Sequence, residues 1–195
     1  MATDLAKPVV SNEQIRFFQD NGYLHVQSFL FERDLTRLRT EVQAFIDDRK
    51  RAFFRQDLGG TGKEEVGQET FVQILGMWKS DAFMKQAACE RRRAELAAGI
   101  MQCDSVRLLS DMILYKPPGG SRPTYWHQDY PNHFNSIPES TIWVALDDAT
   151  KESGCMWYVP GSHKRGELIG YDFGDGSNYQ EKGIDISGAI SSPRL

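Results

Sequence analysis

The 195-residue chain has few cysteines, no long apolar run and no excess of basic residues. Its cysteines, Cys89, Cys103 and Cys155, show no C-x-x-C spacing, which excludes the common zinc-site and disulfide-framework patterns. No apolar run approaches the roughly 20 residues of a transmembrane helix, and there is no N-x-S/T sequon or signal-like start. The net charge of −4 argues against general binding to nucleic acid, whose partners carry a basic surface. We therefore expect a cytoplasmic protein that binds neither a membrane nor a nucleic acid.

A phosphate-binding loop is also incomplete in this sequence. Residues 59–63 are glycine-rich and end in lysine, but Asp57 stands where a Walker motif has its first glycine. Glu64 stands where that motif has the Ser or Thr that binds magnesium. We interpret the segment as a flexible connection between elements of secondary structure.

The N-terminal third is predicted to hold two helices and a short strand. Ser11 followed by Gln14 fits a capping box, and a helix that starts there would end at residues 21–22, an Asn-Gly pair. Alternating apolar residues predict a strand over 23–29. Apolar residues then recur at helical spacing between 32 and 50, which predicts a helix with one face in the core. That stripe consists of Leu35, Leu38, Val42, Phe45 and Ile46.

Further along, the pattern changes from helical to strand-like. Ser80 or Asp81 is suited to begin a third helix, and Gly99 to end it. Short apolar runs that predict strands follow at 106–115, 141–146 and 155–159. After Gly170 the sequence is polar and glycine-rich, with no predicted core element. Helices followed by short strands indicate an α+β, mainly β fold with a sheet-based active site.

The strongest candidate for a functional site is the H-x-D triplet His127-Gln128-Asp129. In an extended segment, residues i and i+2 point to the same side, so the imidazole and the carboxylate converge. They are two of the three ligands in the 2-His-1-carboxylate triad, which binds non-haem Fe(II) and leaves coordination positions open. The sequence therefore predicts His127 and Asp129 as metal ligands.

The stretches around this triplet resemble the phytanoyl-CoA dioxygenase family of Fe(II)/2-oxoglutarate-dependent oxygenases. The resemblance is carried by residues 111–119, 126–129, 143–150, 152–154 and 159–163. It implies a double-stranded β-helix (jelly-roll, cupin-like) core with N-terminal helices, in a single domain over 1–195. In that domain 1–104 would be a mostly helical lead-in, 105–170 the jelly-roll strands with the metal motif, and 171–195 a polar tail.

The same resemblance implies the cofactors and the reaction. Fe(II) would be held by His127 and Asp129, and 2-oxoglutarate would chelate the metal. Met112 and Trp143 match residues that line the 2-oxoglutarate pocket in the family, although ordinary core packing would also explain them. The expected activity is hydroxylation of a C–H bond of a small organic or acyl substrate by O₂, with release of succinate and CO₂.

The sequence departs from the family pattern beyond the triplet. Family members have a second metal-binding histidine on a late strand, followed by an arginine that pairs with 2-oxoglutarate. After Asp129 this chain has only His133 and His163, and Arg165 and Arg194, none at a matching position. We therefore expect the fold to be incomplete at the C-terminus, in which case a homodimer could complete the sheet by strand exchange. The alternative function is a truncated, non-catalytic relative that acts as a binding or interaction module.

Overall fold

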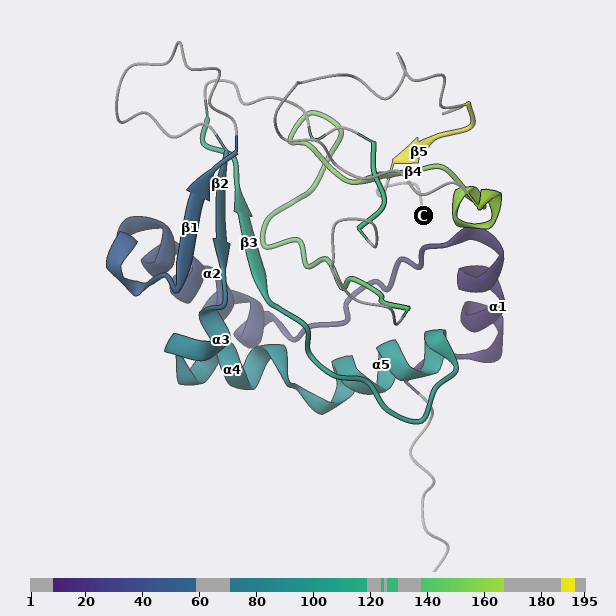
Figure 1. Cartoon of the computed structure of the whole chain (residues 1–195), viewed down its shortest axis with the longest axis horizontal. Coiled ribbons are helices and arrows are strands. Elements are labelled where there is room, and N and C mark those ends of the chain that lie inside the picture. The colour runs from purple at the N-terminus through teal and green to yellow at the C-terminus, as the bar shows by residue number, and fades with distance from the viewer. Residues whose placement is uncertain are drawn as a thin grey trace, which may run out of the picture.

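A computed structural model describes residues 9–58, 71–118, 124, 126–129, 138–166 and 187–191. The described strands form a three-stranded antiparallel sheet, in the order β1 (Phe54–Asp57), β2 (Val72–Leu75) and β3 (Met112–Tyr115). A separate antiparallel pair consists of β4 (Trp157–Tyr158) and β5 (Ile190–Ser191). Figure 1 shows the larger sheet beside α2 (Glu32–Asp47) on the left of the molecule. Helix α5 (Arg91–Met101) runs along the lower edge, and α1 (Asn12–Asn21) lies on the right, below β4 and β5. The predicted connection at 59–63 lies outside the described residues. Within the described ranges, no helix combines the length and the hydropathy needed to cross a membrane.

The first helix, α1 (Asn12–Asn21), forms where the capping signals predicted it. The Ser11 side chain accepts a hydrogen bond from the Gln14 amide, and the Gln14 side chain accepts one from the Ser11 amide. The helix ends at Gly22, whose φ of 85° lies in the left-handed region and whose N–H donates to the Phe18 carbonyl. These contacts confirm both predicted ends.

The strand predicted over 23–29 does not form, and that prediction is wrong. The segment is irregular, and Leu24 and Val26 pack against a small core of Val10, Leu96 and Ile100. Alternation marks a strand only if a neighbouring strand supplies hydrogen bonds, and no described strand pairs with this segment. Leu24 and Val26 are therefore partly buried against this small core and not against a neighbouring strand.

Gly22 is expected to tolerate no side chain, for two separate reasons. A Cβ at this position would lie 2.5 Å from Nδ1 of His163, and the left-handed φ is itself unfavourable for other residues. Gly22→Ala should lower the free energy of unfolding by about 2 kcal/mol or more. Gly166→Ala is the matched control, because Gly166 has a φ of 75° but a Cβ added there would have no other atom within 4 Å.

The comparison is made by urea unfolding of the two variants. Gly166→Ala should lose only the cost of the left-handed conformation, about 1 kcal/mol. Equal losses in the two variants would contradict the proposed clash with His163.

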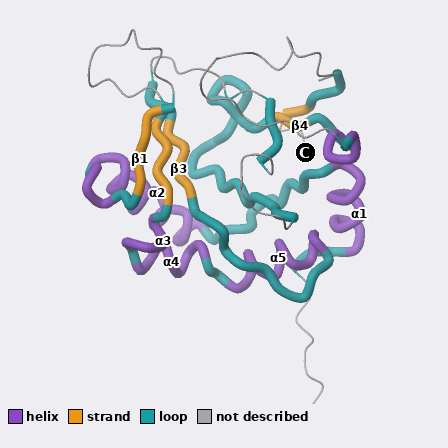
Figure 2. The backbone as a smooth tube through the Cα atoms, viewed as in Figure 1, coloured by secondary structure: helices purple, strands orange, loops and turns teal. Residues whose placement is uncertain are grey.

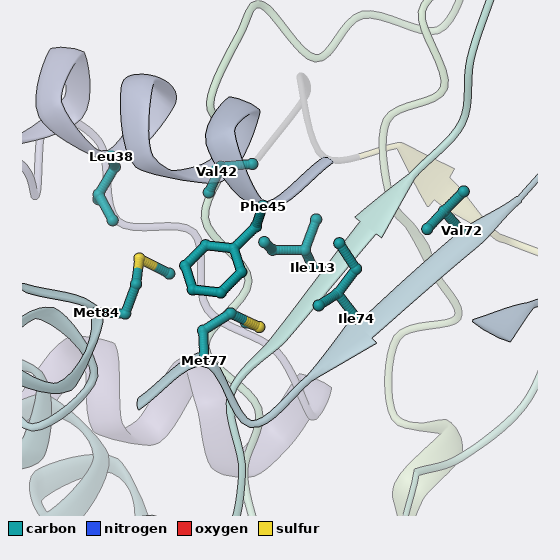
Figure 3. Packing of buried hydrophobic residues seen from close by; sticks show 8 residues of the cluster. All are labelled: Leu38, Val42, Phe45, Val72, Ile74, Met77, Met84 and Ile113. Carbon is teal, nitrogen blue, oxygen red and sulfur yellow. The ribbon is translucent and has the colours of Figure 1, made fainter. Parts of the chain in front are cut away.

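The second helix, α2 (Glu32–Asp47), carries the main hydrophobic core. Four residues of its predicted stripe, Leu38, Val42, Phe45 and Ile46, are confirmed in this core, whereas Leu35 is half-buried outside it. A short 3₁₀ turn, η1 (Arg49–Arg51), follows the helix. Figure 3 shows Phe45 at the centre of the cluster, between the helix and the sheet. The fully or largely buried members are Leu38, Val42, Phe45, Val72, Ile74, Met77, Met84 and Ile113. Burial of this one face fixes α2 against the inner side of the sheet.

The single helix predicted from residue 80 to 99 is instead divided into several. The structure has α3 (Met77–Ser80), α4 (Ala82–Ala88) and α5 (Arg91–Met101). Asp81 accepts a hydrogen bond from the Met84 amide, and Glu90 accepts from the first amides of α5, so each acid starts a new helix. Gly99 lies inside α5, where a Cβ would approach Val10 to 2.4 Å. The glycine therefore allows close packing and does not end the helix.

The three-stranded sheet consists of β1 (Phe54–Asp57), β2 (Val72–Leu75) and β3 (Met112–Tyr115). Two of these strands precede residue 104, in the region expected to be mostly helical, and β3 covers only the end of the strand predicted over 106–115. Arg55, Ile74 and Ile113 align across the sheet on the side that faces α2. The opposite side therefore carries Phe54, Leu75, Met112, Gln56, Gln73 and Leu114.

Asp111 joins the start of β3 to the short helix α3. Its Oδ2 accepts a hydrogen bond of 2.8 Å from the Trp78 amide, and its carbonyl accepts one from Gly76. Burial raises the pKa of the Asp111 carboxyl, although the backbone donors around it oppose this effect. This acid therefore positions β3 against α3.

The smaller sheet pairs β4 (Trp157–Tyr158) with β5 (Ile190–Ser191). The strand predicted over 155–159 is thus confirmed in its centre. β5 was not predicted, because its residues lie in a stretch that we expected to lack any core element, yet Ser191 is almost fully buried. The buried strand predicted over 141–146 is wrong: the segment has no partner among the described strands, and Figure 2 shows this part of the chain between β3 and β4 as loop.

Candidate metal centre

The structure brings the two predicted metal ligands together. Nε2 of His127 lies 3.4 Å from Oδ1 of Asp129, and the two side chains are 24% and 44% exposed. Two ligands about 2.1 Å from a metal and at a right angle to each other are roughly 3 Å apart. A nitrogen and an oxygen at 3.4 Å, open to solvent on one side, therefore fit adjacent positions on one metal ion.

A threonine from another part of the chain holds the carboxylate. The Thr141 hydroxyl donates a hydrogen bond of 2.7 Å to Oδ2 of Asp129, the oxygen that does not face His127. This length is typical of an O–H group that donates to a charged oxygen. The two oxygens of Asp129 thus have different partners.

The charge of the same carboxylate also acts on Tyr158, which belongs to a small aromatic stack. Burial raises the pKa of the Tyr158 phenol, and the nearby Asp129 and Tyr23 raise it further. The Tyr158 ring stacks on Tyr23 with centroids 4.7 Å apart, and Tyr23 meets the edge of Phe17. The residues after α1 therefore support β4 beside the candidate site.

Met112 and Trp143, the two residues matched to a 2-oxoglutarate pocket, are not core residues. Met112 is 46% exposed on the open side of the sheet, and Trp143 is 42% exposed. The Gln73 side chain donates to the sulfur of Met112 and accepts a hydrogen bond from Gln56, so polar groups lie beside it. The alternative explanation by ordinary core packing is therefore wrong for both residues.

Within the described part of the chain, no group of three or more His, Cys, Asp or Glu residues is suited to hold a metal. His163 lies in η3 (Ser162–Arg165), where its Nε2 is 3.0 Å from the Gln19 carbonyl. The next residue, Lys164, pairs with Asp20 at 2.9 Å. This turn is thus bound to α1, which accounts for His163 as a structural residue.

Sequence reasoning missed Thr141 and Tyr158. Both belong to apolar runs that were assigned to strands as a whole, so neither stood out as a polar group near a site. The signal in the sequence was one hydroxyl in each run, at the start of 141–146 and next to the end of 155–159. His133 and Arg194 lie outside the described residues.

Comparisons with known proteins place this geometry in context. The Phytanoyl-CoA dioxygenase (PhyH) family model matches residues 18–188. Phytanoyl-CoA dioxygenase 1 of Oryza sativa subsp. japonica is 26% identical over 187 residues, covering 80% of this chain and 66% of that protein. Dioxygenase lolE1 of Epichloe uncinata is 33% identical, covering 85% of this chain and 64% of that protein.

Among solved structures, the chain is similar to the non-heme alpha ketoglutarate dependent carbocyclase SnoK from nogalamycin biosynthesis. The TM-score is 0.64 at 25% identity, over 81% of this chain and 58% of that chain. The fold is thus similar to that of a 2-oxoglutarate-dependent oxygenase. Because the family model covers most of its length, the chain belongs to the phytanoyl-CoA dioxygenase family. It spans about two thirds of the length of the curated relatives described above.

Proposed function

We propose that this protein is an Fe(II)/2-oxoglutarate-dependent dioxygenase in which His127 and Asp129 bind the metal. The observation that carries the proposal is the 3.4 Å approach of the His127 imidazole to the Asp129 carboxylate. One nitrogen and one oxygen donor suit Fe(II) and leave coordination positions for a co-substrate and oxygen. Membership of the phytanoyl-CoA dioxygenase family supports the same assignment.

The bound iron and 2-oxoglutarate would supply the activation of O₂ for hydroxylation of a C–H bond, with release of succinate and CO₂. The chain itself would bind and orient these groups. His127 and Asp129 would hold the metal, and the stacked rings of Tyr158 and Tyr23 would lie near enough for the Asp129 charge to act on Tyr158. We propose that the chain belongs to one jelly-roll domain, with β3 and β4 among the strands around this centre and the N-terminal helices outside it.

The open side of the large sheet is the proposed binding surface for 2-oxoglutarate. Met112 lies there with its sulfur in contact with the Gln73 amide, and β2 and β3 hold the two residues side by side. Leu114 and Leu75 supply apolar surface on the same side. A surface with both apolar groups and an amide suits a small dicarboxylate whose carbon chain needs burial and whose ends need donors.

The proposed substrate is a small organic or acyl compound. Phytanoyl-CoA dioxygenase 1 and the carbocyclase SnoK, to which the chain is similar, bear names that refer to different substrates and reactions. Specificity in such folds lies in side chains and loops around the site, so the family sets the type of chemistry and leaves the substrate to these residues.

The proposal is tested by an anaerobic titration of the purified chain with Fe(II) and then 2-oxoglutarate. The expected result is the visible charge-transfer band of the iron–2-oxoglutarate chelate, saturating with one equivalent of iron. His25→Ala is a suitable control, because His25 is an exposed histidine that follows α1 and should leave the band unchanged. If no band forms at any practical concentration, the alternative of a non-catalytic binding module replaces this proposal.

A further inference from the structure

We propose that Thr141 is a positioning residue for the metal: its hydroxyl holds the Asp129 carboxylate so that Oδ1 remains directed toward the metal. This inference rests on the proposed function and extends it to a residue that is not a ligand. It stands on one contact, the 2.7 Å hydrogen bond from Thr141 Oγ1 to Asp129 Oδ2.

The carboxylate needs such a partner because it is not fixed by burial. The Asp129 side chain is 44% exposed, so rotation about its last bond would exchange the two oxygens or turn both toward solvent. A charge-assisted hydrogen bond to Oδ2 favours one orientation, and in this orientation Oδ1 is the oxygen that faces His127. Partners of this kind orient ligands and raise the affinity for the metal.

The position of Thr141 in the chain strengthens the argument. It begins the segment 141–146, which forms no strand in the described structure, and it is exposed, so packing does not account for a β-branched residue there. Its hydroxyl links this segment to the loop that carries the H-x-D triplet, 12 residues earlier. The hydrogen bond therefore fixes the loop that carries Asp129 relative to the segment that begins at Thr141.

Two substitutions separate the hydroxyl from the shape of the side chain. Thr141→Val keeps the branched shape and removes the donor, whereas Thr141→Ser keeps the donor and removes the methyl group. Thr40→Val is the matched control, because Thr40 is also exposed and its hydroxyl donates only within α2, to the Thr36 carbonyl. Urea unfolding and circular dichroism verify that each variant is folded.

The measured quantity is the dissociation constant for Co(II) alone, determined by calorimetry on the full chain without 2-oxoglutarate. Thr141→Val should weaken Co(II) binding about 10- to 100-fold. The Co(II) dissociation constants of Thr141→Ser and Thr40→Val should remain within about 3-fold of the value for the unsubstituted chain. A change of this size is clearly smaller than the effect of about 10-fold or more expected when an orienting partner is lost.

Each other outcome overturns the inference in a distinct way. If Thr141→Val binds Co(II) as tightly as the unsubstituted chain, the metal site stands and the role of Thr141 is refuted. If Thr141→Ser weakens Co(II) binding as much as Thr141→Val does, the hydrogen bond from the hydroxyl is not the cause of the effect. If the unsubstituted chain binds no Co(II), the proposed metal centre fails and the inference fails with it.

Discussion

Asp129→Ala is expected to abolish the charge-transfer band of the iron–2-oxoglutarate complex and to weaken metal binding by about 100-fold or more. The reason is that the Asp129 carboxylate supplies the negative charge of the H-x-D pair, with its Oδ1 3.4 Å from Nε2 of His127. Loss of a ligand should cost more than loss of an orienting partner, for which about 10- to 100-fold is typical. His127→Ala should have a similar effect, because the remaining carboxylate would hold Fe(II) from one side only.

Asp129→Asn sharpens this test. The amide retains the size of the side chain and an oxygen that can accept the Thr141 hydrogen bond, but it lacks the negative charge. Its metal affinity should fall nearly as far as that of the alanine variant if charge is the main contribution of Asp129. Asp104→Ala, at an exposed carboxylate beyond α5, is the control and should change nothing. Unchanged metal affinity in Asp129→Ala would refute the assigned site.

Phe45→Ala should cause the largest loss of stability among single substitutions in the core, about 3–5 kcal/mol. Phe45 is fully buried between α2 and the sheet, where it contacts the cluster that includes Ile74 and Met77. The Arg51 guanidinium also lies 4.5 Å from the centre of its ring, so truncation removes a cation–π contact along with the apolar packing. The cavity left behind cannot collapse easily, because elements of both helix and sheet surround it.

Urea unfolding measures this loss directly. The urea concentration at the midpoint of unfolding should fall sharply, while the slope of the unfolding free energy against urea concentration stays the same. An unchanged slope would show that the stability has changed and the cooperative unit has not. Phe31→Ala is the matched control at the N-terminal end of the same helix. Phe31 is 62% exposed, so its loss should cost less than about 1 kcal/mol. Comparable losses in the two variants would show that the core is not centred on Phe45.

Local signals predicted the helices well. The Ser11–Gln14 capping box and Gly22 set both ends of α1, and the apolar stripe of α2 identified Phe45 as a core residue. These features depend on residues close to each other in the chain, so the sequence displays them directly. The acids that divide the third helix, Asp81 and Glu90, are also local signals, and the second of them was overlooked.

Strands and site partners depended on contacts between distant residues. Segments 23–29 and 141–146 have strand-like patterns but no partner strand among the described residues, and β5 has a partner without a strong pattern. The H-x-D motif is short, so the sequence alone indicated that His127 and Asp129 would lie together, as the structure shows; their role as metal ligands stays a prediction. Only the fold brings Thr141 into contact with Asp129 and Tyr158 within range of its charge, so no spacing in the sequence indicated them.

The docking of η3 on α1 has a consequence for how the protein folds. His163 and Lys164 contact residues 144 positions earlier in the chain, and Tyr158 stacks on Tyr23 in the same region. Contacts of such long sequence separation close slowly, because the entropy of a large loop is lost before they form. On the ribosome, α1 emerges first and must wait for the segment 157–165 before these contacts can exist. The stacked pair of Tyr23 and Tyr158 is therefore assembled late, after most of the chain has been synthesised.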